Sequence, residues 1–305
     1  MDTKNYNKTG ETPSQRAQIT TARVFSYIFL AFVTILALFP ILILVINTTR
    51  DRFALQGSFS LIPGTSFLEN LDHTINGDND PNSTFNTVSV PILRGMLNSL
   101  IVAGASCLLT TYFSAMTAYG IHVYDFKLKK FAFNFILIIM MIPAQVSSVG
   151  FVSLVEKMGM MESYWPLIIP SIAAPSVFFY MKQYLESSFP LEVVEAARVD
   201  GCSEFRTFNM ISLPIMKPAI AVQLIFAFVA SWNNFFTPSL ILRSHDNMKT
   251  VPILIQKLST SVLSGGADYG QVYMTIFLSI IPVVIIYFFV SKNIVEGVAL
   301  GAVKG

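Results

Sequence analysis

Few side chains in this chain have the types and spacing of a catalytic or metal site. His73, His122 and His245 are scattered, and the two cysteines, Cys107 and Cys202, stand far apart in an apolar and a polar run. These positions indicate neither a disulfide framework nor a thiolate metal site. The sequence contains no His-Glu-x-x-His motif and no Gly-x-x-x-x-Gly-Lys-Ser/Thr phosphate loop. We therefore expect a protein that is not an enzyme and that binds no metal.

The polar side chains inside the apolar runs are uncharged. Trp232, Asn233 and Asn234 are consecutive, while Asn98 and Gln145 lie in two earlier runs. An indole offers a flat face and an amide offers both donors and acceptors, which is the chemistry that the apolar face and the hydroxyls of a sugar require. We expect Trp232, Asn233, Asn234 and Asn98 to line a path for a neutral polyol. The alternative is that the asparagines join helices and that the tryptophan lies at a membrane interface.

One polar segment, residues 186–217, separates two apolar runs. Pro190 suits the first turn of a helix, Glu192 lies near the positive end of that helix, and apolar residues then recur at helical spacing. Gly201 would end this helix in a left-handed conformation, and Ser203 would cap a second one. The pattern predicts a short helix that lies outside the bilayer.

The middle of this segment has the composition of a docking surface. Ala196 and Ala197 leave room for close approach by another protein, while Glu195, Arg198 and Asp200 supply directional contacts. The alternative is an amphipathic helix that lies on the lipid headgroups without a protein partner.

The overall composition indicates which kind of secondary structure holds these polar residues. The chain has 305 residues, of which 53% are hydrophobic and 12% are charged, and its mean hydropathy is +0.60. A soluble protein carries roughly 25% charged residues. The net charge of +2 is too small and too scattered for nucleic acid binding. We expect membrane lipid as the solvent and an all-α membrane protein.

Six runs have about the 20 apolar residues that a helix needs to cross a bilayer. They are residues 24–47, 96–123, 131–154, 164–181, 218–242 and 272–291. None contains Asp, Glu, Lys or Arg, whereas carriers driven by protons or ions usually keep such groups inside the membrane. A proton-coupled carrier is therefore disfavoured, although the carbonyl groups of a broken helix could still hold Na⁺.

Lys and Arg are more frequent in the segments that would be cytoplasmic if both termini were inside the cell, which favours that orientation. The prediction comprises a cytoplasmic N-terminal segment (residues 1–23), one six-span domain (24–294) and a cytoplasmic C-terminal tail (295–305). Within the domain we expect a long outer loop (48–95), a cytoplasmic loop (186–217) and a second outer loop (243–271). The first outer loop is expected to be irregular around residues 75–87.

Several of these residues carry a resemblance to a known family. Glu195-Ala196-Ala197, Asp200-Gly201 and Leu213-Pro214 resemble the "EAA" loop of bacterial ABC-importer permeases. Three further segments resemble the carbohydrate permeases of the maltose-transporter type, specifically the shorter of the two permease partners: Asn98-Ser99-Leu100, Trp232-Asn233 and the C-terminal residues 301–305. The likeness covers the first span and the chain from about Asn98 to its end.

The resemblance implies a type I ABC importer permease fold in the bacterial plasma membrane, with six transmembrane helices and a cytoplasmic coupling helix. It implies a second, homologous permease subunit, two cytoplasmic ATP-binding subunits and an extracellular solute-binding protein as partners. ATP and Mg would be bound by those partner subunits and no cofactor by this chain. Alternating access driven by the ATPases would then carry a sugar or an oligosaccharide into the cell.

The resemblance also assigns site residues. Glu195, Ala196, Ala197, Asp200 and Gly201 would form the coupling helix that contacts the ATPase. The C-terminal residues Gly301, Ala302, Val303, Lys304 and Gly305 would reach toward the ATPase dimer. The outer loop 243–271 would contact the binding protein, with Gly265 and Gly266 as a flexible tip. The loop 48–95 departs from the family in being longer than is usual for the shorter partner.

Three alternatives remain open from the sequence. The chain could be a stand-alone carrier, which would transport without ATP or partners. It could be a membrane scaffold with no transported solute. It could also be an ABC permease for another small solute, such as an amino acid, phosphate or a metal, although charged cargo usually requires a compensating charge that these spans lack.

Overall fold

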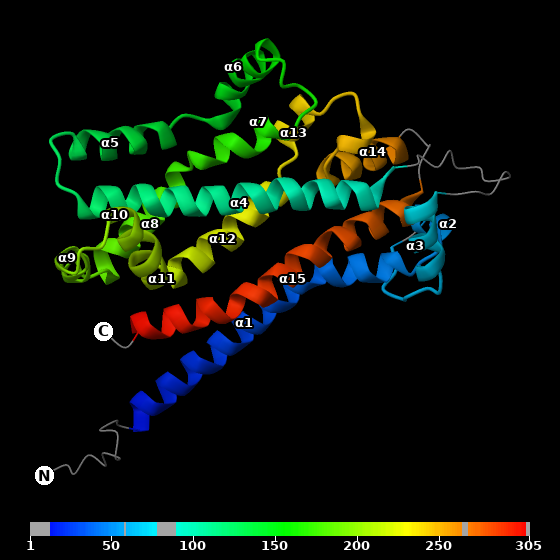
Figure 1. Cartoon of the computed structure of the whole chain (residues 1–305). Coiled ribbons are helices and arrows are strands. Elements are labelled where there is room, and N and C mark those ends of the chain that lie inside the picture. The colour runs from blue at the N-terminus through cyan, green and yellow to red at the C-terminus, as the bar shows by residue number, and fades with distance from the viewer. Residues whose placement is uncertain (1–12, 58, 78–89, 264–267, 303–305) are drawn as a thin grey trace, which may run out of the picture. The chain divides into compact units, whose positions relative to one another are not determined.

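We describe the fold from a computed structural model that covers residues 13–57, 59–77, 90–263 and 268–302. Every regular element in these ranges is a helix (Figure 1). The chain forms two compact units, Met1–Asn70 and Leu71–Gly305.

The first unit contains α1 (Pro13–Thr48), α2 (Arg52–Gly57) and the beginning of α3 (Phe67–Asn76). The part Ala22–Thr48 is long and apolar enough to cross a membrane, and 0% of its most apolar window is buried within the protein. The Asn70 side chain donates hydrogen bonds to the carbonyl groups of Thr48 and Arg50, both at 2.9 Å. The chain after α1 therefore folds back onto the end of that helix.

The second unit is built around α4 (Ile92–Val123), which packs against α8 (Pro175–Ser188) and α12 (Lys217–Trp232) (Figure 1). Ala103, Ala115 and Ala118 of α4 are completely buried. Small side chains let helices approach closely, which is the usual basis of helix packing in membranes. In turn, α15 (Tyr269–Ala302) packs against α12, and α14 (Val251–Leu263) contacts both α15 and α4.

The remaining helices of this unit are short. They are α5 (Lys129–Met140), α6 (Ala144–Lys157), α7 (Trp165–Ile168), the 3₁₀-helix η1 (Ile169–Ile172), α9 (Glu192–Val199), α10 (Glu204–Thr207), the π-helical turn η2 (Phe208–Ser212), α11 (Leu213–Ile215), α13 (Phe236–Ile241) and the 3₁₀-helix η3 (Asp246–Met248).

Among the described residues, four helical stretches are long and apolar enough to cross a membrane, or five if a bent pair of helices counts as one. The four are Ala22–Thr48, Ile92–Val123, Lys217–Ile241 and Tyr269–Ser291. They correspond to the first, second, fifth and sixth runs expected from the sequence, so these four runs are confirmed as long apolar helices. The other two runs differ from the expectation of continuous helices.

The third expected run, 131–154, is two helices rather than one. Helices α5 and α6 meet at an angle of 98°. Pro143 precedes α6 in an extended conformation, with ψ 126°. Proline lacks an N–H group and disfavours helical geometry at the residue before it, so the sequence Ile142-Pro143 explains the break.

The fourth expected run, 164–181, is divided into α7, η1 and α8. Between η1 and α8, Ala173 and Ala174 have ψ values of 83° and 85°, which are not helical. Pro170 lies in η1 and Pro175 is the first residue of α8. These two prolines remove N–H donors and restrict the residues before them, so the run unwinds near its middle.

The expected outer loops contain helices of their own. The range 48–95 includes α2 and α3, and most of the stretch expected to be irregular lies outside the described residues. The range 243–271 contains η3 and α14, whose Leu254 and Leu258 are completely buried. The expected flexible tip, Gly265 and Gly266, also lies outside the described residues.

Candidate functional site

The segment 186–217 lies at the carboxyl end of α4 and forms the predicted short helix, α9 (Figure 1). Gly201 has φ +76°, which confirms the predicted left-handed residue. Its N–H donates to the carbonyl of Arg198 at 3.0 Å, and the N–H of Cys202 donates to that of Ala197 at 2.9 Å. This pair of bonds is a Schellman motif, which satisfies the last carbonyl groups of the helix.

Helix α9 has one buried side and one exposed side. Val194 and Ala197 are 1% and 3% exposed, and Val194 belongs to the core cluster that includes Phe189 and Phe208. Glu195, Ala196, Asp200 and Gly201 are exposed. Ala197 therefore holds the helix on its own protein, whereas the other four predicted coupling residues are available to a partner.

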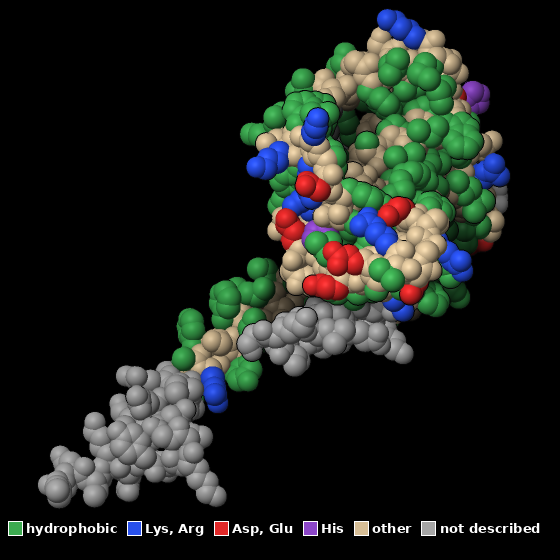
Figure 2. Space-filling model, turned by 60° about the vertical axis from the view of Figure 1, so that its left-hand side comes forward, with side chains coloured by type: hydrophobic (Ala, Val, Ile, Leu, Met, Phe, Trp, Pro, Cys, Tyr) green, Lys and Arg blue, Asp and Glu red, His purple; other side chains and the backbone are tan. Residues whose placement is uncertain are grey.

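The exposed surface around α9 combines charges of both signs with apolar side chains. Figure 2 brings forward the end of the second unit that carries α9 and α10, where acidic and basic side chains are interspersed. Two large apolar side chains of this segment, Val199 and Phe205, are 88% and 69% exposed. Such a mixture of exposed apolar anchors within a polar surround is typical of an interface core and rim.

Three polar side chains tie α9 and α10 to the end of α4. The Nε of Arg198 donates to Glu204 at 2.8 Å, and the hydroxyl of Tyr124 donates to the other oxygen of Glu204 at 2.6 Å. The Arg198 guanidinium also lies 5.7 Å from the centre of the Tyr124 ring. The Arg198 guanidinium and the Tyr124 hydroxyl hold the pKa of the Glu204 carboxyl below its usual value. Burial, together with the bond to Glu204, raises the pKa of Tyr124 to about 12.

The structure bears on two further sequence predictions, the capping role of Ser203 and the position of the C-terminal residues 301–305. Ser203 precedes α10 in an extended conformation, as a capping residue should, but among the described residues its side chain makes no capping bond. At the C-terminus, Gly301 and Ala302 belong to the last turn of α15, whereas Val303, Lys304 and Gly305 lie outside the described residues.

A cavity of about 650 Å³ lies between α4, α6, α8 and the α12–α13 junction. Its lining combines small apolar residues with hydroxyl groups and one amide, and within the described residues it includes no charged side chain. Ser147, Ser176, Ser231 and Thr237 line it, and none of these side chains makes a hydrogen bond within the described part of the chain. Such a cavity offers free neutral donors and acceptors to a solute with hydroxyl groups.

Three hydroxyl groups on α4 donate hydrogen bonds to carbonyl groups of the broken stretch α7–η1–α8, which forms part of the cavity wall. Ser106, Thr110 and Ser114 lie one helical turn apart and donate to the carbonyl groups of Leu167, Ser171 and Ala174 at 3.4, 2.8 and 3.4 Å respectively. Backbone that is not helical within a membrane needs partners of this kind, because lipid supplies none.

The structure separates the four residues that the sequence grouped as a pathway. Asn234 lines the 650 Å³ cavity, and its Oδ1 accepts a 3.3 Å bond from the N–H of Thr237. Asn233 and Trp232 border a different cavity of about 330 Å³. The indole of Trp232 is 3% exposed, stacks on Phe228 at 5.6 Å and donates to the carbonyl of Ser279 at 3.2 Å.

Asn98 lines neither of these cavities and lies near the amino end of α4. It is 2% exposed, and its amide donates to the carbonyl groups of Asn247 and Lys249 at 2.8 and 3.0 Å. The next residue, Ser99, accepts a 2.9 Å bond from the N–H of Val251. This pair of residues holds the loop that precedes α14.

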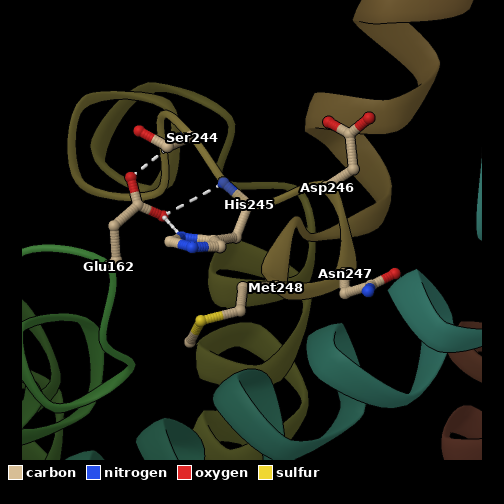
Figure 3. Close-up of a pocket in the computed structure, with 6 residues that line it drawn as sticks. All are labelled: Glu162, Ser244, His245, Asp246, Asn247 and Met248. Atoms are coloured by element: carbon tan, nitrogen blue, oxygen red, sulfur yellow. Dashed lines mark hydrogen bonds and ion pairs between the residues drawn. The ribbon is translucent and has the colours of Figure 1, made fainter.

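Sequence reasoning missed a second cluster at this end of the unit. A pocket of about 450 Å³ is lined by the six residues in Figure 3: Glu162, Ser244, His245, Asp246, Asn247 and Met248. Burial by itself raises the pKa of Glu162, but the N–H groups of residues 243–245 outweigh that effect and hold the pKa of Glu162 below its usual value. The only sequence signal was an acid placed in a short turn, which is unremarkable.

Within the described residues, no group of three or more His, Cys, Asp or Glu side chains is arranged to hold a metal ion. Three regions of the second unit carry the polar features described above, namely the α9–α10 surface, the uncharged cavity and the loop held by Asn98 and Glu162.

Comparisons with known proteins place this arrangement among transport proteins. Residues 111–298 match the family described as binding-protein-dependent transport system inner membrane component. The arabinooligosaccharides transport system permease protein AraQ of Bacillus subtilis (strain 168) is 32% identical over 291 residues, which cover 94% of this chain and 98% of the relative. The sn-glycerol-3-phosphate transport system permease protein UgpE of Escherichia coli (strain K12) is 30% identical over 276 residues, covering 90% of this chain and 95% of the relative.

A solved structure has the same fold. It belongs to a bacterial ABC transporter involved in the import of the acidic polysaccharide alginate, with a TM-score of 0.72 and 18% sequence identity. The match covers 92% of this chain and 98% of that chain. At this level of identity the likeness concerns the fold alone.

Proposed function

Since the chain belongs to the family of binding-protein-dependent transport system inner membrane components, we propose that it is one of two homologous permease subunits of an ABC importer for a neutral sugar or oligosaccharide. The carbohydrate class is supported by an oligosaccharide permease that resembles the chain over nearly its whole length. We further propose that it is the shorter of the two subunits and that it spans the bacterial plasma membrane six times, with both termini in the cytoplasm.

The observation that carries the cargo proposal is the uncharged cavity of about 650 Å³. Relatives and fold neighbours include transporters named for anionic cargo, such as sn-glycerol 3-phosphate and alginate. An anion inside a membrane protein needs a compensating positive charge or a helix N-terminus. The described cavity lining includes the first turn of α8 but no positive side chain, and its several free hydroxyl groups favour a neutral solute with many hydroxyl groups.

The exposed side of α9 supports a role in coupling to ATP hydrolysis. Glu195, Ala196, Asp200 and Gly201 face outward, and the sequence has no phosphate-binding loop of its own. We propose that the exposed side of α9 contacts one of two cytoplasmic ATPase subunits, which bind ATP and Mg. Gly301–Gly305 would contact the ATPase dimer from the C-terminal tail.

In this proposal, closure of the ATPase dimer moves α9 and thereby the helices packed on it. The buried side of α9 contacts the same core cluster as α4 and α8, so a displacement would reach both walls of the cavity. The result is alternating access, in which the cavity opens first to the extracellular binding protein and then to the cytoplasm.

The test is a complex purified with its partner permease, its ATPases and its binding protein, then reconstituted in liposomes. We expect Glu195→Lys to leave the protein inserted while it abolishes stimulated ATPase activity and sugar uptake, because it reverses a charge on the docking surface. Asp125→Lys is the matched control, since Asp125 is an exposed acid at the same end of the unit but outside α9.

Two results would contradict the proposal. Wild-type stimulation and uptake in the Glu195→Lys complex would remove α9 from the coupling surface. Uptake by the purified chain alone, without ATP or partners, would favour a stand-alone secondary carrier instead.

A further inference from the structure

The carboxylate of Glu162 joins two segments of the second unit. Glu162 lies in the turn between α6 and α7, and its side chain contacts the loop between α13 and α14. The main-chain N–H groups of Arg243, Ser244 and His245 all donate to Glu162, at 2.7, 2.7 and 3.5 Å. The Nδ1 atom of His245 lies 3.4 Å from the same carboxylate. Figure 3 shows the carboxylate of Glu162 directed at the loop from the neighbouring turn.

The main chain of Glu162 is held as well as its side chain. Its N–H donates to the carbonyl of Ile241 at 3.2 Å. Its φ of +55° is left-handed, and it is the only residue other than glycine with a positive φ in the described chain. A glutamate rarely adopts this conformation, and such residues persist where the surrounding contacts require them.

The rest of the loop is anchored differently. Asn98 binds the carbonyl groups of Asn247 and Lys249, and the Tyr164 hydroxyl donates to the carbonyl of Met248 at 3.1 Å. In the described structure, Glu162 accepts the bonds from all three N–H groups of residues 243–245. One half of the loop is thus fixed by Asn98 of α4 and by Tyr164, and the main-chain N–H groups of the other half are held by the Glu162 carboxylate.

The half held by Glu162 is also the half that faces outward. Arg243, Ser244 and His245 are exposed, and the pocket of about 450 Å³ opens beside them. The loop contacts the amino end of α4, whereas α9 and α10 contact its carboxyl end. If α9 faces the cytoplasm, as proposed above, this loop faces the extracellular binding protein.

We propose that Glu162 is a positioning residue that holds loop 243–248 in the conformation to which the loaded binding protein docks. This inference rests on the proposed function of the chain as a binding-protein-dependent permease. Glu162 acts through the three N–H groups that it fixes, and the surface offered to the partner consists of Arg243, Ser244 and His245.

The test compares Glu162→Gln with Glu156→Gln in the complete transporter. Glu156 is an exposed acid at the end of α6, close in the chain to Glu162, and no hydrogen bond of its side chain is seen in the described structure. Hydrogen–deuterium exchange is followed at the amides of residues 243–245. Because a neutral amide oxygen is a weaker acceptor than a carboxylate, we expect exchange there to become about 10-fold faster in Glu162→Gln and to be unchanged in Glu156→Gln.

The functional readout is the ATPase rate as a function of the concentration of sugar-loaded binding protein. In Glu162→Gln the half-saturating concentration should rise about 5-fold or more while the maximal rate is retained, since only docking is impaired. A general structural defect would instead lower the maximal rate.

A second variant addresses the chance that Glu162→Gln does not fold. Glu162→Gly removes the carboxylate while glycine readily adopts the positive φ, so the turn should keep its backbone. The same faster exchange and the same rise in half-saturating concentration are expected.

Each outcome decides a separate statement. Unchanged exchange at residues 243–245 would overturn the role of Glu162 in holding the loop. Faster exchange with an unchanged half-saturating concentration would overturn the docking role. A wild-type transporter that no loaded binding protein stimulates would instead refute the proposed function on which the inference rests.

Discussion

At the scale of single residues, Asn98 joins two segments that lie far apart in the chain. Its amide carries two hydrogen bonds to the carbonyl groups of Asn247 and Lys249 and is almost fully buried. The pairing joins α4 to a loop about 150 residues later in the chain, as the separations of 149 and 151 show. Its chemistry is that of a clamp between distant segments.

We predict that Asn98→Ala destabilises the protein by about 1–3 kcal/mol, because two carbonyl groups lose a buried donor. The measurement is the thermal unfolding midpoint of the detergent-solubilised complex. Asn134→Ala is the matched control, since Asn134 is exposed on α5 and makes no side-chain bond within the described residues. Equal midpoints for the two variants would contradict the clamp.

Glu204 provides a second residue-scale prediction, this time about pH. Its pKa is lowered in the folded protein by Arg198 and Tyr124, so its contribution to stability is complete above the usual pKa of 4.5 and declines as the pH falls below that value. Tyr124 keeps its proton throughout, because its pKa is about 12. The difference in thermal midpoint between wild type and Glu204→Gln should therefore be present at neutral pH and shrink in acid.

The control for this titration is Glu192→Gln, an exposed acid at the start of α9 with no side-chain bond in the described structure. Glu192→Gln loses only the interaction of the carboxylate with the helix N-terminus, so its thermal midpoint should differ from wild type by less than that of Glu204→Gln at neutral pH. A difference for Glu204→Gln that stays constant down to acid pH would show that the carboxylate charge is not what stabilises the contact.

At the scale of elements, prolines break one apolar run and hydroxyl groups of α4 bind the carbonyl groups that the break exposes. Pro170 and Pro175 divide one apolar run into α7, η1 and α8, and thereby free carbonyl groups that a continuous helix would satisfy. Ser106, Thr110 and Ser114 supply the missing donors from a single face of α4. The break is therefore tolerated because the neighbouring helix carries hydroxyl groups at one-turn spacing.

We predict that Thr110→Val lowers stability by about 1 kcal/mol, since the carbonyl of Ser171 loses a 2.8 Å bond inside the membrane while the side-chain shape is kept. Thr117→Val is the control, because within the described residues the exposed Thr117 hydroxyl bonds only to the carbonyl of Phe113 in its own helix. Unfolding of both variants by a denaturing detergent checks the difference. If Thr117→Val destabilised the protein as much as Thr110→Val, the hydrogen bond between Thr110 and Ser171 would add no more stability than a bond within one helix.

At the scale of the whole molecule, the second unit has a surface at each end of α4 and a cavity between them. The α9–α10 surface lies at the carboxyl end of α4, the loop held by Asn98 lies at its amino end, and the cavity is bounded by α4 along its length. A long, closely packed helix that contacts all three regions is suited to transmitting a movement from one end to the other.

We predict that Asn234→Leu lowers the rate of sugar uptake several-fold while stimulation of the ATPase by the binding protein persists, because Asn234 lines the cavity and lies away from both end surfaces. The adjacent Asn233 borders a different cavity, so Asn233→Leu is the matched control. Uptake and ATP hydrolysis are measured together in liposomes, and an unchanged ratio of sugar to ATP in Asn234→Leu would exclude the cavity as the route.

The sequence alone predicted a membrane environment and several of the helices. Runs without charge predicted membrane spans, four of which are long helical stretches, and Pro190 with Gly201 marked the limits of α9. These features are local, because the hydropathy of a run and the backbone preferences of proline and glycine act within a few residues.

Only the tertiary structure decided which polar side chains meet. Asn234 lines one cavity while its neighbour Asn233 borders a different one. Glu162 binds a loop that is more than 80 residues away, as the separations of 81 and 82 show. The physical reason is that the direction of a side chain depends on how each helix is rotated and where it breaks. Packing against distant helices sets the rotation of each helix about its axis. The sequence pattern of one apolar run does not specify this rotation.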